Sequence, residues 1–410
     1  MKNILYIILI TCFSLAIFSC GKKGDGSSSS NTGGSTSGGG ASYSCSFKNT
    51  KSFIVGNAVT EKCIFYDCPK SKIVIWDLNG CMKVVGESVL GAVDAASHNN
   101  SIYIADDAGY YWIAGPETIE KKKINNSSGY KLSEITGISV NSTGNVYVAG
   151  NVVKKRKSYT AYWKNGELVK AFRENGLTKD GTIYSEKHVA ADSKGNVFIP
   201  GWRIDMHHHT DGAIWINGNI KILKPETEDV EATDAVIGSE TTSGANVWVS
   251  GAHGPYTQGG TLAAYWRRNP NGQSNQTKVT KVRTYNSPKN WVYSSRASSI
   301  FIGGSIVYMA GVVNVINAGD VPVYWKNKVQ HELPVEFDLS TCVYCKADPT
   351  DISLLDDKVL VVGDYYDAND KVDSYFSHGE KKAVYWLEKK LHKICESCGS
   401  SYAVAVVVMD

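Results

Sequence analysis

Short stretches of alternating hydrophobic and polar residues, rich in Val, Ile, Tyr and Trp, recur along the chain from about residue 50 to its end. This period-two alternation predicts half-buried β-strands, and turns rich in Gly and Asn separate the stretches. The clearest copy is Ile138–Gly150 followed by Ala161–Val169, in which Lys164-Asn165-Gly166-Glu167 is typical of a tight hairpin turn. Convincing amphipathic helical patterns are absent. The sequence therefore predicts an all-β fold.

The same unit is repeated, and a tryptophan marks one position of it. The third predicted strand carries Trp76, Trp112, Trp163, Trp215, Trp266, Trp325 and Trp386, which are spaced by about 50 residues except between the first two. The second predicted strand ends at Gly56, Gly150, Gly201, Gly251, Gly311 and Gly363, with Ser101–Asp106 as a degenerate seventh copy. Seven related units of this kind indicate a repeat architecture.

A four-stranded sheet cannot bury both of its faces alone, so successive units must stack, and radial stacking gives a β-propeller. We expect seven blades of four antiparallel strands, with each tryptophan wedged between neighbouring blades. The first repeat begins at Phe53 with its second strand and has no evident first strand. Tyr402–Met409, at the other end, is a predicted strand that belongs to no other repeat. We therefore predict that the C-terminal strand completes blade one and closes the ring.

Two segments carry a family resemblance. Asp192–Ile199 and its counterpart Asn141–Val148 resemble the repeats of bacterial extracytoplasmic β-propellers of the NHL and SBBP type. The resemblance covers roughly residues 50–410 and consists mostly of turn and strand residues. It implies the propeller fold, and it transfers no catalytic residues.

The N-terminus has the features of an export signal. Lys2 precedes an apolar run, Ile4–Phe18, which is shorter than the roughly 20 residues that a membrane-spanning helix needs. The run ends in Ser19-Cys20-Gly21, which resembles a bacterial lipobox and implies removal of residues 1–19 and lipidation of Cys20. An ordinary secretory signal is the alternative. Because Gly21-Lys22 is similar to lipoproteins sent beyond the inner membrane, we expect an outer-membrane anchor in the cell envelope.

Residues 20–42 form a predicted tether, and residues 43–410 form the propeller domain. The segment 24–41 is almost wholly Gly, Ser, Thr and Asn, a composition that behaves as a flexible coil. The 410-residue chain is 42% hydrophobic and 20% charged, which indicates a sizeable folded core. Its formal net charge of +3 gives no field that favours nucleic acid, so we expect no nucleic-acid partner.

Ten cysteines are present, and Cys12 leaves with the signal peptide. Beyond Cys20, eight remain in an oxidising compartment, which favours disulfide bonds. We expect Cys45 to pair with Cys81, and we expect three loops beside the ring closure to bring together Cys63, Cys68, Cys342, Cys345, Cys395 and Cys398. A zinc site built from the two Cys-x-x-Cys pairs, or redox exchange, is the alternative.

The connections between strands give the candidate binding residues. The first-to-second and third-to-fourth connections are short, so the other two classes are expected to form one decorated face above the central channel. On that face we expect ligand loops that carry Lys154, Lys155, Arg156 and Lys157, then His207, His208, His209 and Asp211, and finally Asp364, Tyr365, Tyr366 and Asp367.

The histidine run invites a metal interpretation. Three consecutive histidines on a strand would point to alternating faces, however, and the acidic run lacks the spacing of an EF-hand loop. We therefore predict no metal and no cofactor. We also find no nucleophile elbow and no phosphate-binding loop.

The leading functional hypothesis is a membrane-anchored extracytoplasmic lipoprotein whose propeller binds a protein or a glycan, and it is not an enzyme. One alternative is a propeller enzyme of the lyase or glycoside hydrolase type, with a site at the channel and with His188 and His253 as candidates. Another is a structural subunit of an envelope complex.

Overall fold

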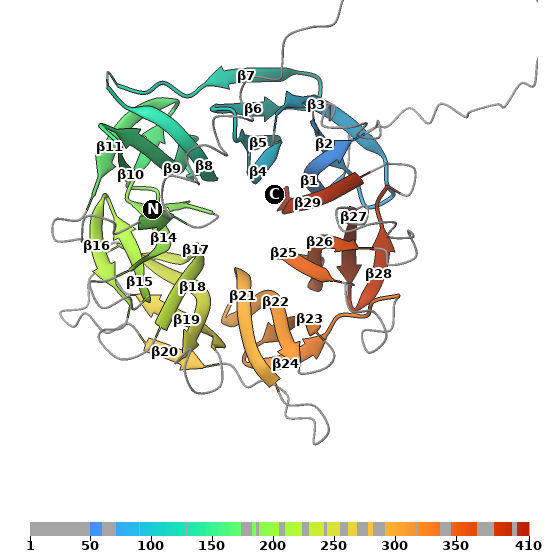
Figure 1. Ribbon diagram of the computed structural model, residues 1–410. Helices are drawn as coiled ribbons and strands as arrows, with labels where there is room; N and C mark the ends of the chain where they lie inside the picture. The colour runs from blue at the N-terminus through green and yellow to red at the C-terminus, as the bar shows by residue number, and fades with distance from the viewer. Residues whose placement is uncertain are drawn as a thin grey trace, which may run out of the picture. The chain divides into compact units, whose positions relative to one another are not determined.

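In the computed structural model the chain divides into two units, residues 1–44 and residues 45–410, and every residue described here belongs to the second. The structure describes residues 50–59, 71–89, 91–127, 129–173, 183–185, 188–204, 210–223, 229–241, 244–254, 261–268, 278–281, 292–315, 319–336, 346–366, 381–395 and 400–409. These residues form seven antiparallel sheets around a central axis, which is the predicted seven-bladed β-propeller (Figure 1).

The blades are numbered here in chain order, and their strands are given from the axis outward. Blade 1 contains β29 (Ser400–Val408), β1 (Ser52–Val59), β2 (Ser71–Trp76) and β3 (Met82–Ser88). Blade 2 contains β4 (Ala92–His98), β5 (Ser101–Asp106), β6 (Tyr110–Ala114) and β7 (Ile119–Lys123). Blade 3 contains β8 (Lys131–Val140), β9 (Val146–Lys154), β10 (Lys157–Lys164) and β11 (Glu167–Phe172).

In blade 4 the innermost strand is split into β12 (Ile183–Ser185) and β13 (Ala190–Ala191), followed by β14 (Val197–Ile204), β15 (Thr210–Ile216) and β16 (Asn219–Ile222). Blade 5 contains β17 (Asp229–Thr241), β18 (Gly244–Gly254), β19 (Leu262–Arg268) and β20 (Lys278–Lys281). Blade 6 contains β21 (Val292–Gly303), β22 (Ile306–Val315), β23 (Gly319–Lys326) and β24 (Val329–Glu332). Blade 7 contains β25 (Ala347–Leu355), β26 (Lys358–Tyr366), β27 (Lys381–Leu387) and β28 (Lys390–Lys393).

The C-terminal strand closes the ring as predicted. β29 pairs antiparallel with β1 from Ser52 opposite Val408 to Val59 opposite Ser400, so the end of the chain supplies the innermost strand of blade 1. The label of the C-terminus accordingly lies beside the axis, next to β1 and β4 (Figure 1). Ala403 and Ala405 are fully buried in this strand, which makes it part of the core.

The tryptophans lie on the third strand of each blade, as predicted, and they are buried between blades. Six of the seven are at most 1% exposed, and Trp112 is 9% exposed. Trp163 of blade 3 packs in one cluster with Ala105 and Tyr111 of blade 2. Phe172 of blade 3 stands 6.1 Å from Trp215 of blade 4, measured between ring centroids. Each tryptophan therefore joins two sheets into one hydrophobic layer.

The recurring glycines were predicted to end the second strands, and that prediction is wrong. β9, β18, β22 and β26 all continue beyond their glycine. Opposite each of these glycines the innermost strand has a β-bulge. In blade 5, for example, Ala232 of β17 pairs with Gly251, and the bulge lies between Ala232 and Asp234. A Cβ atom at Gly251 would collide with the carbonyl oxygen of Glu231. The glycine is therefore required by the close approach of the bulged strand.

The hairpins between the third and fourth strands are two residues long in blades 3, 4, 6 and 7, as predicted, whereas the connection in blade 5, residues 269–277, lies outside the described residues. Asn165 and Gly166 have φ values of 51° and 87°, the left-handed conformation that a two-residue turn between β10 and β11 requires. The Oδ1 atom of Asn165 accepts the backbone N–H of Val146 at 2.9 Å, and Asn217 and Asn327 make the same bond in blades 4 and 6. No helix among the described residues is long and apolar enough to cross a bilayer.

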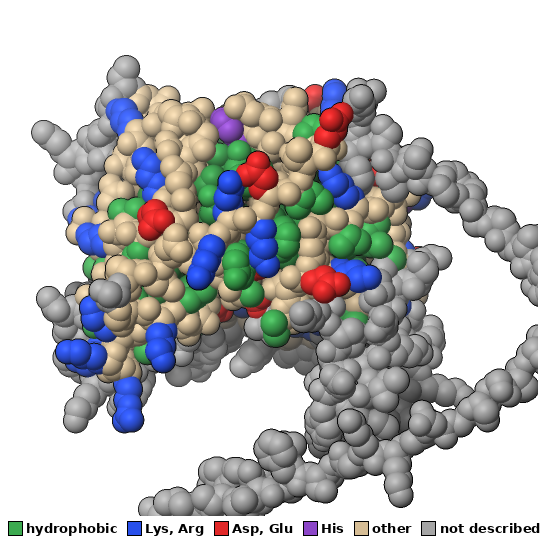
Figure 2. Space-filling model, turned by 90° about the horizontal axis from the view of Figure 1, so that it is seen from above, with side chains coloured by type: hydrophobic (Ala, Val, Ile, Leu, Met, Phe, Trp, Pro, Cys, Tyr) green, Lys and Arg blue, Asp and Glu red, His purple; other side chains and the backbone are tan. Residues whose placement is uncertain are grey.

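The outer edge of blade 2 is a basic surface. All five residues of β7 are exposed, and three of them are Lys121, Lys122 and Lys123. The Nζ atom of Lys121 lies 3.9 Å from the ring centroid of Tyr110, a cation–π distance. Figure 2 shows Lys and Arg side chains among hydrophobic ones on this side of the ring. Charged side chains on an edge strand discourage pairing with another sheet.

Candidate functional site

The site is built from one repeated position, the residue that follows the bulge on the innermost strand of each blade. We call it the ring position. It is occupied, from blade 1 to blade 7, by Ala405, Asp94, Gly137, His188, Asp234, Ser299 and Asp351. In blade 4 the register of β13 with β14 places His188 there, just before the strand resumes. Five polar residues thus occupy this position in five different blades.

The aspartates at the ring position bind each blade to the next. Asp94 accepts the backbone N–H of Ile138 through Oδ2 at 2.8 Å. Asp234 accepts that of Ile300 at 2.9 Å. Asp351 accepts that of Val406 at 2.8 Å and so ties blade 7 to the closing strand β29. In each case the N–H belongs to the residue after the ring position of the following blade, so these are charge-assisted links around the axis.

The bulged residues add a second set of links in the same direction. The hydroxyl of Thr233 donates to the carbonyl oxygen of Ala297 at 2.7 Å. The hydroxyl of Ser298 donates to that of Pro349 at 2.6 Å, and the hydroxyl of Thr350 donates to that of Ala403 at 3.0 Å. These bonds satisfy backbone groups that the bulge removes from the ladder.

His188 is held in an unusual conformation. Its φ of 70° is left-handed, which is costly for a residue with a side chain. Its backbone N–H donates to the carbonyl oxygen of Thr136 at 3.2 Å, and its Nδ1 lies 2.9 Å from Asp94 Oδ1. A Cβ atom at Gly137 would lie 2.7 Å from the His188 backbone. The glycine of blade 3 therefore makes room for a histidine of blade 4 to reach blade 2.

The charges around His188 set its protonation. Burial by itself lowers the pKa of His188, but the charges of Asp234, Asp94 and Asp351 outweigh burial and raise the pKa to about 10. The imidazole is therefore a cation at neutral pH, with N–H donors at both nitrogens. Nδ1 is directed to Asp94, while Nε2 is buried and has no hydrogen-bond partner among the described residues.

Asp234 and Asp351 are joined through one hydroxyl. The Oγ atom of Ser299 lies 3.0 Å from Asp234 Oδ2 and 2.7 Å from Asp351 Oδ1. Burial raises the pKa of Asp351 to about 6 and also raises the pKa of Asp234, although the charge of His188 opposes both shifts. The hydroxyl of Ser299 has one proton and can donate it to only one of the two carboxyls at a time. The arrangement therefore fits a second proton that the two carboxyls share.

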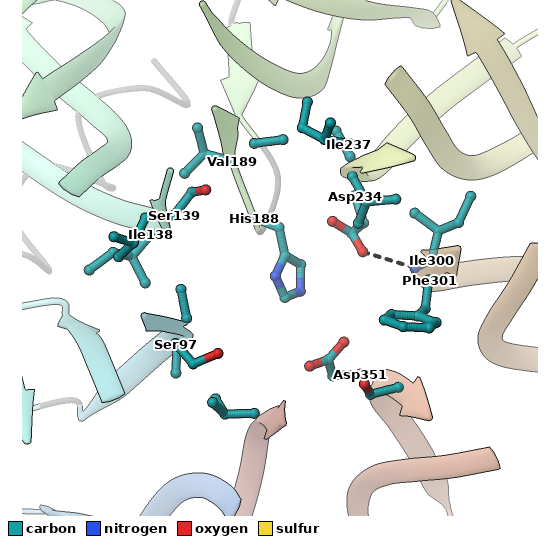
Figure 3. Close-up of a pocket in the computed structure, with 18 of the residues that line it drawn as sticks. Ser97, Ile138, Ser139, His188, Val189, Asp234, Ile237, Ile300, Phe301 and Asp351 are labelled. Carbon is teal, nitrogen blue, oxygen red and sulfur yellow. Dashed lines mark hydrogen bonds between the residues drawn. The ribbon is translucent and has the colours of Figure 1, made fainter. Parts of the chain in front are cut away.

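A cavity of about 590 Å³ extends along the channel from these residues. Figure 3 shows the imidazole of His188 in the middle of the channel, with Asp234 and Asp351 on one side of it and Ser97 and Ser139 on the other. Phe301 contributes an aromatic ring to the wall (Figure 3). Such a volume is in the range of sites for small ligands.

The cavity lies on the opposite side from the one that the sequence favoured. It extends toward Asn141 and Ser142 in the short turn between β8 and β9. The predicted site was beneath the longer connections at the other end of the channel. The inner strands run from that end toward the short turns, and the bulges place the ring position partway along them. The cavity is therefore lined by the part of each inner strand that runs from the ring position to the short turn.

The basic candidate loop is a tight hairpin rather than a long loop. Lys154 ends β9 and Lys157 begins β10, so only Lys155 and Arg156 form the turn, with φ values of 49° and 61°. Lys154 Nζ lies 4.3 Å from the ring centroid of Tyr130. The expectation of a long second-to-third connection is wrong in this blade.

The acidic candidates lie within strands where the structure describes them. Asp364 and Tyr365 belong to β26 and are 4% and 3% exposed, and Asp364 forms an ion pair with Lys381 at 3.2 Å. Tyr366 ends the same strand. Asp211 is buried in β15, where Oδ2 accepts the Nε–H of Arg203 at 3.0 Å. Asp211, Asp364 and Tyr365 do not line the cavity.

Several candidates fall outside the described residues. They are Cys20 with the tether, His207, His208, His209 and Asp367. Among the described residues no group of three or more His, Cys, Asp or Glu is arranged to hold a metal ion. His253, the second candidate of the enzyme hypothesis, is fully buried in β18 of blade 5 and does not line the cavity.

The cysteines are described only in part. Cys81 and Cys395 are each engaged in a disulfide bond. The other predicted partners, Cys45, Cys63, Cys68, Cys342, Cys345 and Cys398, lie outside the described residues. The predicted pairing, and the zinc alternative for the Cys-x-x-Cys pairs, stay predictions.

The ring position was not among the predicted site residues, although the sequence carries a signal for it. A hydroxyl residue precedes the ring position in four blades, as in Thr233-Asp234 and Thr350-Asp351, and an aliphatic residue or alanine follows it in all seven. Aligning the copies on their tryptophans alone hides this signal, because the connecting loops differ in length.

Comparison with known proteins adds only distant likenesses. No protein-family model and no curated protein matches the chain. Among solved structures, the chain is similar to a lignostilbene dioxygenase of Pseudomonas brassicacearum, at 10% identity and a TM-score of 0.43 over 87% of this chain and 91% of that chain. It is also similar to the extracellular domain of a putative one-component system of B. thetaiotaomicron, at 11% identity and a TM-score of 0.38 over 76% of this chain and 37% of that chain. At these values neither likeness bears on activity.

Proposed function

We propose that this protein is a lipid-anchored lipoprotein of the bacterial cell envelope whose β-propeller is a binding module, with the ligand site in the central channel. The observation that carries the proposal is a cavity of about 590 Å³ whose floor holds His188 with an unpaired Nε2. Buried polar atoms are normally hydrogen-bonded, so an unpaired imidazole nitrogen facing a cavity is a group reserved for a ligand.

The electrostatics favour binding over acid–base catalysis. A general base must lose its proton near the working pH, whereas the surrounding aspartates hold the pKa of His188 well above that range. Asp351 has a pKa nearer to neutrality, but both of its oxygens already accept hydrogen bonds from Val406, Ile352 and Ser299. A histidine that keeps its proton at neutral pH suits recognition better than proton transfer.

The envelope location rests on the N-terminal residues. The apolar run 4–18, the lipobox-like Ser19-Cys20-Gly21 and the Gly- and Ser-rich tether are together typical of an exported lipoprotein. A tether of this composition lets a folded domain reach ligands away from the membrane surface.

The test is a pair of tryptophan substitutions in the mature protein, residues 20–410. Ser139→Trp fills the channel, because Ser139 lines the cavity, whereas Ser158→Trp places the same side chain on an exposed position of β10. Binding of envelope protein and envelope polysaccharide fractions is then measured for both variants and for the wild type. We expect Ser139→Trp to abolish the binding that Ser158→Trp retains. Equal binding by the two variants would overturn the channel site.

A further inference from the structure

We propose that the channel recognises a neutral sugar residue through one hydroxyl group, which accepts a hydrogen bond from His188 Nε2 and donates one to Asp234 Oδ1. This inference rests on the proposed binding function and names its ligand class. It follows from which polar atoms of the site are already engaged and which are not.

Two atoms on adjacent blades are left over. The Nδ1 contact with Asp94 fixes the imidazole of His188 in the channel (Figure 3), and its buried Nε2 has no partner among the described residues. The Oδ2 atom of Asp234 accepts the N–H of Ile300 and lies near the Ser299 hydroxyl, while Oδ1 accepts no hydrogen bond from a described residue. Figure 3 shows this second oxygen on the side of the carboxylate that is nearer to His188. The site thus offers one charged donor beside one acceptor.

The charge distribution argues against an ionic ligand. A cationic group that approached Asp234 would meet the imidazolium of His188, whose pKa the aspartates keep raised. An anionic group that approached Nε2 would meet Asp234 and Asp351. A hydroxyl adds no charge, and its single oxygen both donates and accepts. It therefore satisfies the two leftover atoms together without a desolvated net charge.

The wall of the cavity fits a sugar ring better than a peptide. Hydroxyl side chains of Ser97 and Ser139 line one side, and the aromatic ring of Phe301 lies on another (Figure 3). A pyranose ring has a hydroxyl-rich edge and an apolar face of C–H groups, so it can meet both kinds of wall. A peptide amide separates its donor and acceptor onto two atoms and lacks the edge of hydroxyls.

The experiment follows the imidazole of His188 directly. Mature protein labelled with ¹⁵N-histidine is titrated with the methyl glycosides of glucose, galactose and mannose, and separately with glucosamine, glucuronate and N-acetylglycinamide. We expect at least one neutral glycoside to shift the His188 Nε2 resonance saturably and the other three probes to leave it unchanged. Asp234→Asn should weaken that binding by about tenfold or more, because it replaces the acceptor Oδ1 by a donor.

Asp351→Asn is the matched control. It removes the same charge from the same channel, but at a carboxyl whose oxygens are occupied by Val406, Ile352 and Ser299, so the affinity should change by less than about threefold. A response to glucosamine, glucuronate or the amide alone, a response equal in the two variants, or no response to any glycoside would overturn the sugar assignment. The envelope-fraction test with Ser139→Trp would still stand in those cases, so the two proposals fail separately.

Discussion

His188 of blade 4 contacts Asp94 of blade 2, with Nδ1 and Oδ1 2.9 Å apart, across a glycine that blade 3 contributes to the same ring. The contact spans three blades because Gly137 has no side chain and because the His188 backbone adopts a left-handed φ. The position and orientation of the His188 imidazole therefore depend on Gly137 and Asp94, neither of which lines the cavity.

The first prediction concerns that glycine. Gly137→Ala places a methyl group about 2.7 Å from the His188 backbone, so blade 3 or His188 must shift. We expect a loss of about 2 kcal/mol in the free energy of unfolding, typical of overpacking, and a displaced His188 resonance. Urea unfolding and histidine NMR measure the two effects. Gly304→Asn is the control, because Gly304 has open space where a Cβ would lie and its φ of 59° is one that asparagine adopts. A variant as stable as this control, with an unmoved resonance, would contradict the interpretation.

The second prediction is a pH dependence of stability. Because the pKa of His188 is about 10 in the folded protein and near 6.5 in an unfolded chain, folding stability from this group is fully present below pH 6.5 and is lost as the pH rises toward 10. We expect a decrease on the order of a few kcal/mol across this window. Urea unfolding at pH 6.5, 8 and 10 measures it. His188→Asn should show a smaller decrease in the free energy of unfolding over this pH range, because the other titrating groups are common to both proteins. Parallel plots of stability against pH for the two proteins would contradict the raised pKa of His188.

The third prediction concerns ring closure. Deletion of residues 401–410 removes most of β29, exposes the buried edge of β1 and breaks the bond from Asp351 to Val406. We expect no cooperative unfolding transition by circular dichroism and little soluble protein. Asp410 follows β29 in the sequence, so deletion of this residue alone should leave the unfolding transition unchanged. A truncated chain that unfolds cooperatively would show that the strand is dispensable.

The fourth prediction concerns the anchor. Cys20→Ala should move the protein from the membrane fraction to the soluble fraction of the envelope, because a lipidated cysteine is the proposed attachment. Cys12→Ala, which changes a residue of the signal peptide, should leave the distribution unchanged. Detergent phase partitioning measures it. Membrane association of the Cys20→Ala protein would point to another attachment.

The fold was predictable from the sequence where one residue type marks one place in the blade. The tryptophans revealed the repeat because a large aromatic residue must fill the gap between sheets, and the Asn-Gly turn at 165–166 revealed a hairpin because few residues adopt its φ values. The closing strand followed from an unpaired β segment at the end of the chain.

The site was less predictable, because it depends on a bulge. A bulge changes the alternation by one residue, so the pattern does not say whether Asp234 or Thr233 faces the axis. His188 is a further case, since the strand pattern breaks around it and only the three-dimensional ring shows that it shares a position with aspartates. The loops that the sequence favoured are those expected to be long, and the length of a loop does not indicate on which side of the ring position the cavity lies.

The closing strand has a further consequence for the cavity. Val406, Val407 and Val408 form part of its wall, and they belong to the strand that joins the last blade to the first. A ring in which β29 has not paired with β1 lacks that wall and lacks the N–H that Asp351 binds. The cavity is therefore a property of the closed ring, because no run of blades can form it before the two ends of the propeller meet.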